Sequence, residues 1–299
     1  MKLIDSQVFE IAESDIFKKI ELIGRTCYKS ESSITSDSAS RFVTNLVKNQ
    51  HLAMLEHADI TFMVRRDYIQ QDLDNGISPN PFLTVTIEPG ADHALVTSNL
   101  RVLIEGEGAL LDCLRSMLCY GAPDIADVLI PDFKPQADIG DGCILQPSQL
   151  HPKFQDKHIR KTFRFITDRG VSHELVRHRV ASFAQESTRY CSYDKDKFNN
   201  ELTFIRPSTW DSMSSQSREA FLGMCDASES GYMQMIASGC QPQQARAVLL
   251  NAIKTEIVVT ASVEEWKHIG DLRLRGTTGK PHPDMQDVMQ KLQSIFPEI

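Results

Sequence analysis

Hydrophobic residues follow two kinds of spacing along this chain: three to four residues apart in some segments, and alternating or continuous in others. The first spacing is typical of amphipathic helices and the second of strands. Helices are predicted over Ser14–Cys27, Ser36–Glu56, Arg101–Leu118, Ser212–Ser238, Gln243–Ile253 and Pro283–Phe296. Strands are predicted over Asp59–Arg65, Thr84–Glu88, Ala94–Ser98, Lys161–Asp168, Glu201–Pro207 and Lys254–Ser262.

The order of these elements indicates the fold class. Strands do not alternate strictly with helices, which favours an α+β fold with a largely antiparallel central sheet, flanked by helices, over a doubly wound sheet. Between Ala122 and Pro152 the chain is rich in Pro, Gly and Asp, while strand patterns continue on both sides. We therefore expect a single domain over residues 1–299, with a surface insertion at about 122–152.

Composition narrows the possible partners and the compartment. The formal net charge of -8 argues against a general nucleic-acid-binding surface, which needs a basic face. The seven cysteines include no C-x-x-C pair, so free thiols in a reducing compartment are expected and a metal site is not. The first residues lack a signal-peptide pattern, and no segment approaches the roughly 20 apolar residues that span a bilayer. A cytoplasmic protein without membrane or nucleic-acid partners is expected.

One stretch is basic against this acidic background. From Arg160 to Arg179 there are six Arg or Lys residues and two acidic residues, Asp168 and Glu174. A helix is predicted to begin after Gly170 with Ser172 as its cap, which would place His173 and Arg177 on one face. Such a run is usually a solvated helix face, and composition alone favours that interpretation. Guanidinium groups and nearby hydroxyls are, however, also the usual ligands of phosphates and carboxylates.

Three other interpretations of this region can be weighed from its residues. Ser187 lacks the G-x-S-x-G elbow of a hydrolase nucleophile. His178, with His173, could serve a zinc-dependent hydrolase, but no H-E-x-x-H motif or cysteine at ligand spacing accompanies them. An anion or nucleotide sensor without catalytic activity would need only the arginines. Binding of an anion is the hypothesis that the residue types favour.

The spacing of the cluster is more specific than its composition. Arg177 to Arg189 follows the pattern R-H-R-x-x-S-x-x-x-x-S-x-R, with Tyr190 directly after it. This pattern resembles the signature of the flavin-dependent thymidylate synthases. Further segments are similar to that family: Gly24–Ser30, His51–Ala58, Thr97–Arg101, Gln244–Val263 and Glu265–Arg273. The resemblance therefore extends over much of the chain.

The resemblance implies an enzyme that methylates dUMP to dTMP, with 5,10-methylenetetrahydrofolate as carbon donor, FAD as cofactor and NADPH as reductant. It also implies a homotetramer with shared active sites. Carried onto this sequence, the dUMP-binding residues are Glu174, Arg177, Gln185, Glu186, Ser187, Thr188, Arg189, Arg246 and Arg273. The FAD-binding residues are His51, Ala53, Glu56, Arg177, His178, Arg179, Ser262 and His268. Arg273 is implied as the catalytic residue, placed against the uracil ring to favour its ionised form.

Some positions depart from the family pattern. Gln185 stands where many members have Glu, and Leu250 replaces a common Pro. Ser262 and Glu264 occupy positions where Asn and Arg frequently contact FAD, so the adenine or pyrophosphate end of the cofactor could be held differently. The alternative to the enzyme is a non-catalytic module that binds a nucleotide or flavin.

Overall fold

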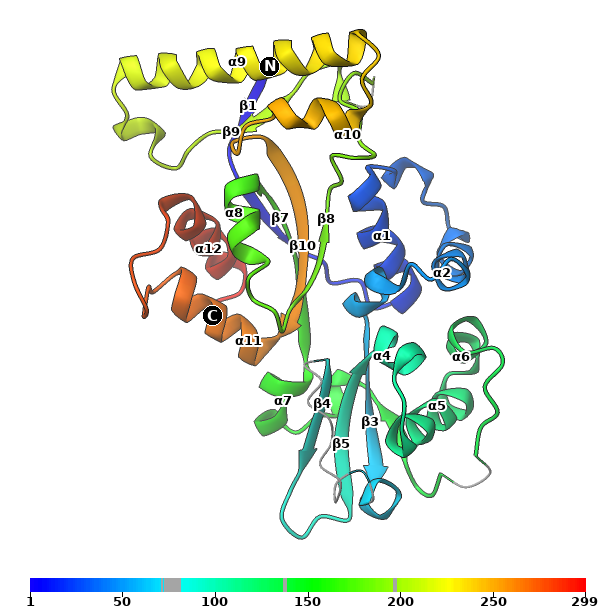
Figure 1. Ribbon diagram of the computed structural model, residues 1–299. Coiled ribbons are helices and arrows are strands. Elements are labelled where there is room, and N and C mark those ends of the chain that lie inside the picture. The colour runs from blue at the N-terminus through cyan, green and yellow to red at the C-terminus, as the bar shows by residue number, and fades with distance from the viewer. Residues whose placement is uncertain (71, 73–81, 137–138, 196–197) are drawn as a thin grey trace.

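The computed structural model describes residues 1–70, 72, 82–136, 139–195 and 198–299 and contains two antiparallel four-stranded sheets (Figure 1). The first sheet has the order β2 (Gln7–Glu10), β7 (Arg160–Asp168), β10 (Lys254–Ser262), β8 (Ser182–Gln185). The second has the order β4 (Leu83–Ile87), β5 (His93–Asn99), β3 (Asp59–Arg65), β6 (Cys143–Leu145). In addition, β1 (Lys2–Ile4) pairs in parallel with β9 (Thr203–Ile205).

Helices cover both sheets. The α-helices are α1 (Ile16–Tyr28), α2 (Ser38–Lys48), α4 (Leu100–Glu105), α5 (Ala109–Gly121), α6 (Pro123–Leu129), α7 (Pro152–His158), α8 (Arg169–Leu175), α9 (Ser215–Ala237), α10 (Pro242–Ala245), α11 (Val263–Arg273) and α12 (Pro283–Ile295). Short 3-10 helices are η1 (Glu31–Ser33), η2 (Leu52–His57), η3 (Arg66–Ile69), η4 (Pro147–Gln149), η6 (Trp210–Ser212) and η7 (Arg246–Val248). In Figure 1, α8, α11 and α12 lie on one side of β7 and β10, and α1 lies on the other.

The hydrophobic core has two main parts, one for each large sheet. The first packs β3 and β5 against α1, α2 and α4–α6, with Phe62, Val96 and Leu114 fully buried. The second packs β7 and β10 against α11 and α12 around the buried Trp266. A smaller cluster lies beneath α9, which crosses the top of the molecule in Figure 1. The largely antiparallel α+β prediction is confirmed, with the strands divided between two sheets.

Two segments predicted as single continuous helices are interrupted in the structure. The helix predicted over Ser36–Glu56 ends at Lys48, because Gln50 adopts a left-handed conformation (φ 56°) and the chain continues as η2. The helix predicted over Arg101–Leu118 is split into α4 and α5. The break is at Gly106–Gly108, where Gly108 has φ 119°, a value that a residue with a side chain rarely adopts.

Two further predictions need correction near the functional segments. The helix predicted over Gln243–Ile253 is only the short α10 followed by η7. The cap of α8 is Asp168, whose carboxylate accepts a hydrogen bond from the Val171 N–H at 2.8 Å, not Ser172. Since α8 ends at Leu175, His173 and Arg177 do not share a helix face.

The range predicted as a surface insertion, 122–152, contains ordered elements. Ala126 and Leu129 of α6 are buried in the first core, and β6 pairs with β3. The single domain with an insertion here stays a prediction. Among the helices of the described ranges, none combines the length and apolar character needed to cross a membrane.

Candidate functional site

The RHR segment forms an exposed turn between α8 and β8. The side chains of Arg177 and Arg179 are exposed, and neither makes a hydrogen bond or ion pair with any residue of the described ranges. His178, between them, points inward and is only 7% exposed. Val176 and Val180, at the two ends of the turn, are each 40% exposed. The turn therefore offers two unpaired guanidinium groups beside apolar surface.

Arg273 lies directly beneath this turn, at the end of α11. Its guanidinium donates a hydrogen bond from Nη1 to Glu174 Oε2 at 2.8 Å and from Nη2 to the Glu174 carbonyl at 3.3 Å. Its Nε donates to His178 Nε2 at 3.1 Å. Glu174 thus fixes the fork of the guanidinium, and the arginine in turn orients the imidazole.

This contact also decides the protonation of His178. An arginine Nε can only donate, so His178 Nε2 must accept, and the ring proton of the neutral imidazole lies on Nδ1. Burial lowers the pKa of His178 to about 4, and the positive charges of Arg273, His268 and Arg177 add to the effect. At neutral pH the imidazole is therefore uncharged, with an N–H at Nδ1 available to a neighbour.

The second half of the signature runs along β8 and the loop after it. The Gln185 amide donates to Ser172 Oγ and to Thr255 Oγ1, each at 3.0 Å. Ser187 donates its backbone N–H to the Cys27 carbonyl at 2.9 Å, which ties this loop to the end of α1. Ser187 is half-buried and Thr188 is buried, whereas Arg189 is exposed with its guanidinium 5.5 Å from the Tyr190 ring centroid.

Glu186 belongs to a buried charge cluster. Its carboxylate accepts from Lys254 Nζ at 2.8 Å and from the Tyr193 hydroxyl at 3.3 Å, and its side chain is 1% exposed. Lys254 also lies 2.8 Å from Glu256, which in turn lies 2.6 Å from Lys29. The Glu186 side chain is therefore turned away from the exposed arginines, and its predicted contact with the nucleotide stays a prediction.

The segment predicted to border the flavin, η2, packs against the start of β8. The Glu56 carbonyl accepts a hydrogen bond from Ser182 Oγ at 3.2 Å, and its carboxylate pairs with Arg101 at 2.7 Å. His51 and Ala53, at the other end of η2, are exposed. The structure thus joins the η2 segment to the signature through Ser182.

Three predicted residues lie apart from this group or at its edge. The side chain of Arg246, on η7, is exposed and makes no hydrogen bond or ion pair within the described part of the chain. Ser262 caps α11, where its hydroxyl accepts from the Glu265 N–H at 3.1 Å. His268 is exposed on α11, close enough to His178 for its charge to lower the pKa of that residue. No hydrogen bond or ion pair joins the side chain of Arg246 or Ser262 to the signature among the described residues.

Lys254 is the residue of this region that sequence reasoning missed. The sequence predicted Lys254 as the first residue of a strand and gave it no other role. In the structure, its ammonium group pairs with the buried carboxylates of Glu186 and Glu256. A pattern that could have found it is present, since Lys254 and Glu256 are two residues apart and share one face of an otherwise apolar strand. Charged side chains on a strand that is expected to be buried need an oppositely charged partner, because burying an unpaired charge is costly.

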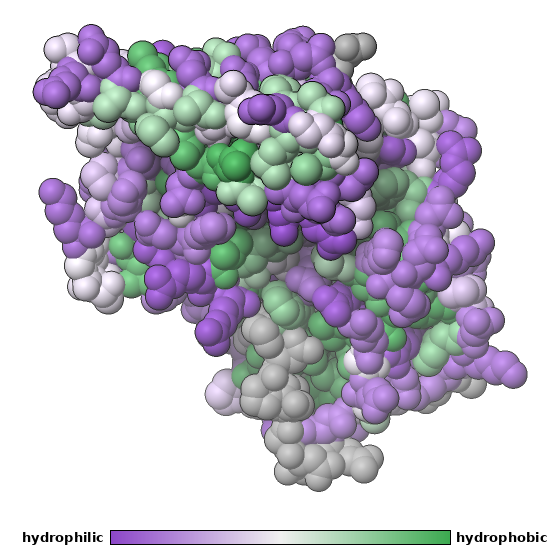
Figure 2. Space-filling view, turned by 45° about the horizontal axis from the view of Figure 1, so that its top comes forward, coloured by the Kyte–Doolittle hydropathy of each residue, from purple (hydrophilic) through white to green (hydrophobic). Residues whose placement is uncertain are grey.

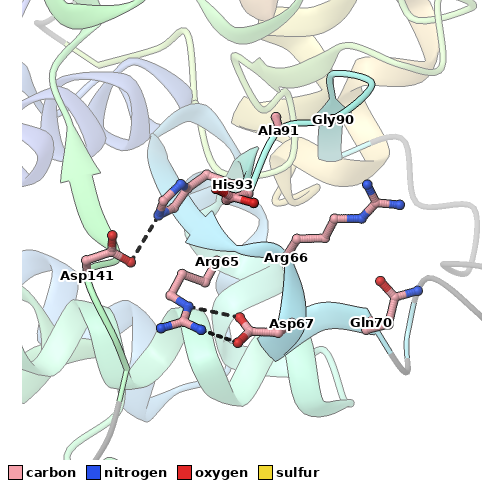
Figure 3. A pocket seen from close by; sticks show the side chains of 9 residues that line it. Arg65, Arg66, Asp67, Gln70, Gly90, Ala91, His93 and Asp141 are labelled. Atoms are coloured by element: carbon pink, nitrogen blue, oxygen red, sulfur yellow. Dashed lines mark hydrogen bonds and ion pairs between the residues drawn. The ribbon is translucent and has the colours of Figure 1, made fainter.

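A separate polar pocket lies at the far end of β3 and β5 (Figure 3). Its volume is about 680 Å³, and it is lined in part by Arg65, Arg66, Asp67, His93 and Asp141. Arg65 pairs with Asp67, and His93 lies 3.0 Å from Asp141, so most of its charges are matched within the pocket. It contains none of the residues predicted for FAD or dUMP.

Exposed hydrophobic residues occur on the surface of the molecule. Figure 2 shows a largely hydrophilic face on which hydrophobic side chains gather in patches, one of them in the upper half of the view. Besides Val176 and Val180, the exposed hydrophobic residues include Tyr190, Met224 and Val248. Tyr190 directly follows the signature and contacts Tyr28 edge to face, with 5.5 Å between the ring centroids.

Comparison with known proteins identifies the class. The family model described as thymidylate synthase complementing protein matches residues 11–71 and 156–299, and the chain belongs to this family. It is similar to the flavin-dependent thymidylate synthase of Pyrococcus furiosus, with 36% identity over 116 residues, which is 38% of this chain and 46% of the relative. To the flavin-dependent thymidylate synthase of Geobacter sulfurreducens it is 35% identical over 163 residues, covering 54% of this chain and 66% of the relative.

The matches to these curated relatives therefore span between about half and two thirds of their length. Among solved structures, the chain is similar to a UMP/dUMP methylase, PolB from Streptomyces cacaoi, with a TM-score of 0.43 and 12% identity over all of this chain and 93% of that one. The family match is interrupted over 72–155, a range that includes α5, α6 and β6.

A buried histidine beside the site gives a prediction for stability. His57 of η2 is fully buried, its Nδ1 lies 2.8 Å from Thr260 Oγ1, and burial together with the positive charge of Lys19 lowers its pKa to about 3. Below pH 6.5 the unfolded chain takes up a proton that the folded chain does not, so stability falls as pH falls, by about 1.4 kcal/mol per pH unit. In urea unfolding, the wild type should lose about 2 kcal/mol more than His57→Asn between pH 6.5 and 4.5.

Asn is suited to this substitution because its amide can keep a hydrogen bond to Thr260 while it cannot titrate. The matched control is His173→Asn, at an exposed position. It should follow the wild-type pH dependence. Equal pH dependence of His57→Asn and wild type would contradict the prediction.

Proposed function

We propose that the protein is a flavin-dependent thymidylate synthase, an enzyme that converts dUMP to dTMP with 5,10-methylenetetrahydrofolate as carbon donor and NADPH as reductant. The observation that carries the proposal is the arrangement of the signature. Two unpaired arginines lie at the surface of the turn, directly above Arg273, which Glu174 and His178 hold in one orientation. Membership of the family and similarity to proteins named flavin-dependent thymidylate synthase support it.

The exposed turn fits a flavin cofactor. FAD combines a pyrophosphate with an extended ring system, and the turn offers the guanidinium groups of Arg177 and Arg179 next to the apolar Val176 and Val180. The Nδ1–H of His178 adds a donor held in a fixed tautomer. His51, Ala53, Glu56, Ser262 and His268 complete the proposed FAD site. Bound FAD, once reduced by NADPH, would supply the hydride that completes the new methyl group.

The residues of this chain would bind and polarise the nucleotide. Arg273 stays protonated at all relevant pH values, so its guanidinium can stabilise negative charge that develops on the uracil ring. Ser187, Thr188 and Arg189 would hold the phosphate with hydroxyl and guanidinium donors. The proposed nucleotide site also includes Glu174, Arg177, Gln185, Glu186 and Arg246.

We further propose a homotetramer with shared active sites, in the cytoplasm. The exposed Arg246 side chain, which makes no hydrogen bond or ion pair in the described chain, supports a site completed by a second copy. Sedimentation of the purified protein gives the mass directly. A monomer that turns over dUMP would contradict this part of the proposal.

The absorbance spectrum of the purified protein tests the proposal. We expect a flavin band, or its appearance when FAD is added, and bleaching of that band by NADPH under anaerobic conditions. The double variant Arg177→Ala/Arg179→Ala should weaken FAD binding by at least about tenfold, because each charge-assisted hydrogen bond contributes about 1.5–3 kcal/mol. A fluorescence titration with FAD measures the change.

Arg206→Ala is a suitable control, since Arg206 is a half-exposed arginine that pairs with Asp5 on a different part of the surface. It should bind FAD like the wild type. A colourless protein that fails to take up FAD would overturn the proposed enzyme. Nucleotide binding without flavin would instead point to the non-catalytic binding module.

A further inference from the structure

A second cavity lies where the two large sheets meet, and none of the residues that line it is among those proposed to bind FAD or dUMP, although its Arg160 pairs with Ser262 across β7 and β10. Its volume is about 350 Å³, within the range of small-molecule sites. The wall is formed by the start of α1, β3, α6, β6 and the start of β7. Much of it is apolar, from Ile16, Ile60, Ile125, Ile144, Leu145 and Ile159.

The charged part of this wall is incompletely satisfied. The Arg160 side chain is 5% exposed, and its one ion pair is Nε with Asp59 Oδ1 at 2.9 Å, where the N–H is not directed at the oxygen. Neither terminal guanidinium nitrogen of Arg160 has a hydrogen-bond partner in the described ranges. The half-buried Lys19 ammonium lines the same cavity and has no hydrogen bond or ion pair there either. Arg160 Nε is buried without a hydrogen-bond partner, which is costly, and an anion bound beside this side chain would supply acceptors to the guanidinium and to the Lys19 ammonium.

The other titratable groups of the cavity leave this excess of positive charge in place. His158 is hydrogen-bonded at both ring nitrogens, to Thr97 and Thr86, and burial lowers its pKa to about 4, so it is neutral. Glu13 lies at the mouth, exposed, with its carboxylate accepting the Asp15 N–H at 2.8 Å. The interior therefore holds two basic side chains, Lys19 and Arg160, and one acidic side chain, Asp59; burial lowers the pKa of Lys19 and raises the pKa of Asp59.

We propose that this cavity binds a small organic carboxylate with an apolar body. The carboxylate would lie between Lys19 and the free nitrogens of Arg160, and the body would lie against the isoleucines of β3, α6 and β6. A purely inorganic anion would leave the apolar wall unused, and a neutral hydrocarbon would leave the two cations without an acceptor.

Part of the cavity wall lies outside the range that the family model matches. Seven of the eighteen residues that line the cavity lie within 121–147, in the range that the family model does not match. Lys19 and Arg160 lie within the matched ranges, so the carboxylate site would combine them with apolar residues from outside the match, such as Ile125 and Ile144, and the proposal does not depend on methylation of dUMP.

Calorimetric titration of the full-length protein with octanoate tests the proposal. Two comparison ligands are titrated in the same way: octan-1-ol, which has the apolar chain of octanoate without its charge, and acetate, which has the carboxylate without the long apolar chain. We expect octanoate to bind at least about tenfold more tightly than either, because the site uses both features. Lys19→Met should weaken octanoate binding by about tenfold or more while leaving octan-1-ol unaffected.

Two further variants make the result specific to this cavity. Lys18→Met changes the neighbouring lysine, which is exposed and does not line the cavity, and it should bind octanoate like the wild type. Ala122→Leu narrows the cavity without changing its charge and should also weaken octanoate binding. Equal affinity for octanoate and octan-1-ol, displacement of octanoate by an equal concentration of inorganic phosphate, or unchanged binding by Lys19→Met would each overturn the proposal.

Discussion

Replacing Arg273 by alanine should lower the turnover of dUMP by about 100- to 1,000-fold while leaving FAD bound, a loss typical of removing one pre-oriented donor to a developing negative charge. The physical reason is visible in the contacts of the residue. Glu174 and His178 hold the guanidinium through hydrogen bonds of 2.8 and 3.1 Å, so its position is fixed before substrate arrives. Steady-state kinetics measures the loss, and the flavin absorbance of the same sample measures occupancy.

Arg275→Ala is the matched control for this experiment. Arg275 lies two residues further on, is 43% exposed and pairs with Asp271 one turn before it. Its removal should leave turnover within about twofold of wild type, since exposed ion pairs contribute little. Near-normal turnover of Arg273→Ala would remove Arg273 as the activating residue and make Arg275 the candidate.

A lysine at position 273 separates charge from geometry. Lys keeps the positive charge but cannot bridge Glu174 and His178 with a planar fork. We therefore expect Arg273→Lys to recover only part of the lost turnover. Full recovery would show that charge alone is sufficient.

The secondary structure could be predicted where the hydrophobic pattern is long and uninterrupted. β10 was predicted with its observed ends, Lys254 and Ser262, and β3 likewise over Asp59–Arg65. Helix ends were less predictable, because they depend on single residues. Gln50 ends a helix by adopting a left-handed conformation that Gln seldom favours, so composition carried no indication of it.

The candidate site could be predicted as a set of residues but not as a geometry. The spacing of the signature indicated Arg177, His178 and Arg179, and the resemblance added Arg273. Their contacts join residues 99 and 95 positions apart, and only the tertiary fold, which brings the end of α11 to the end of α8 and the turn after it, places them together. The tautomer of His178 follows from that packing, so no sequence pattern could have given it.

The position of Glu186 could not be predicted from its residue type, because a glutamate is usually exposed. It follows Gln185 in a polar run, yet β8 turns its side chain inward, where it meets Lys254 from β10 and Tyr193. Burial alone would lower the pKa of Lys254, but the two carboxylates beside it more than offset this and raise the pKa. The ammonium groups of Lys254 and Lys29 hold the pKa of Glu256 below its ordinary value in spite of its burial. Lys254 and Glu256 are therefore both charged at neutral pH.

Lys254→Met should accordingly lower the free energy of unfolding by about 3–5 kcal/mol at pH 7.5, the usual cost of removing one partner of a buried ion pair. The substitution leaves the Glu186 carboxylate 1% exposed with the Tyr193 hydroxyl as its one remaining donor among the residues that the structure describes, while Glu256 keeps Lys29. Lys161→Met provides the matched control, because Lys161 pairs with Glu10 at the same 2.8 Å but both side chains are about one third exposed. It should cost no more than about 1 kcal/mol in the same urea titration.

The pH dependence of this loss identifies its cause. In Lys254→Met the unpaired, buried Glu186 should have a raised pKa, so the folded variant takes up a proton as pH falls, at values where the unfolded chain does not. The difference in stability from wild type should therefore shrink between pH 7.5 and 5. Adding Glu186→Leu to the variant removes the stranded charge and should restore part of the stability at pH 7.5, as apolar replacement of a buried pair often does. If the single variant lost the same free energy at both pH values, or if the second substitution destabilised it further, the loss would come from packing around Lys254 and not from the unpaired carboxylate.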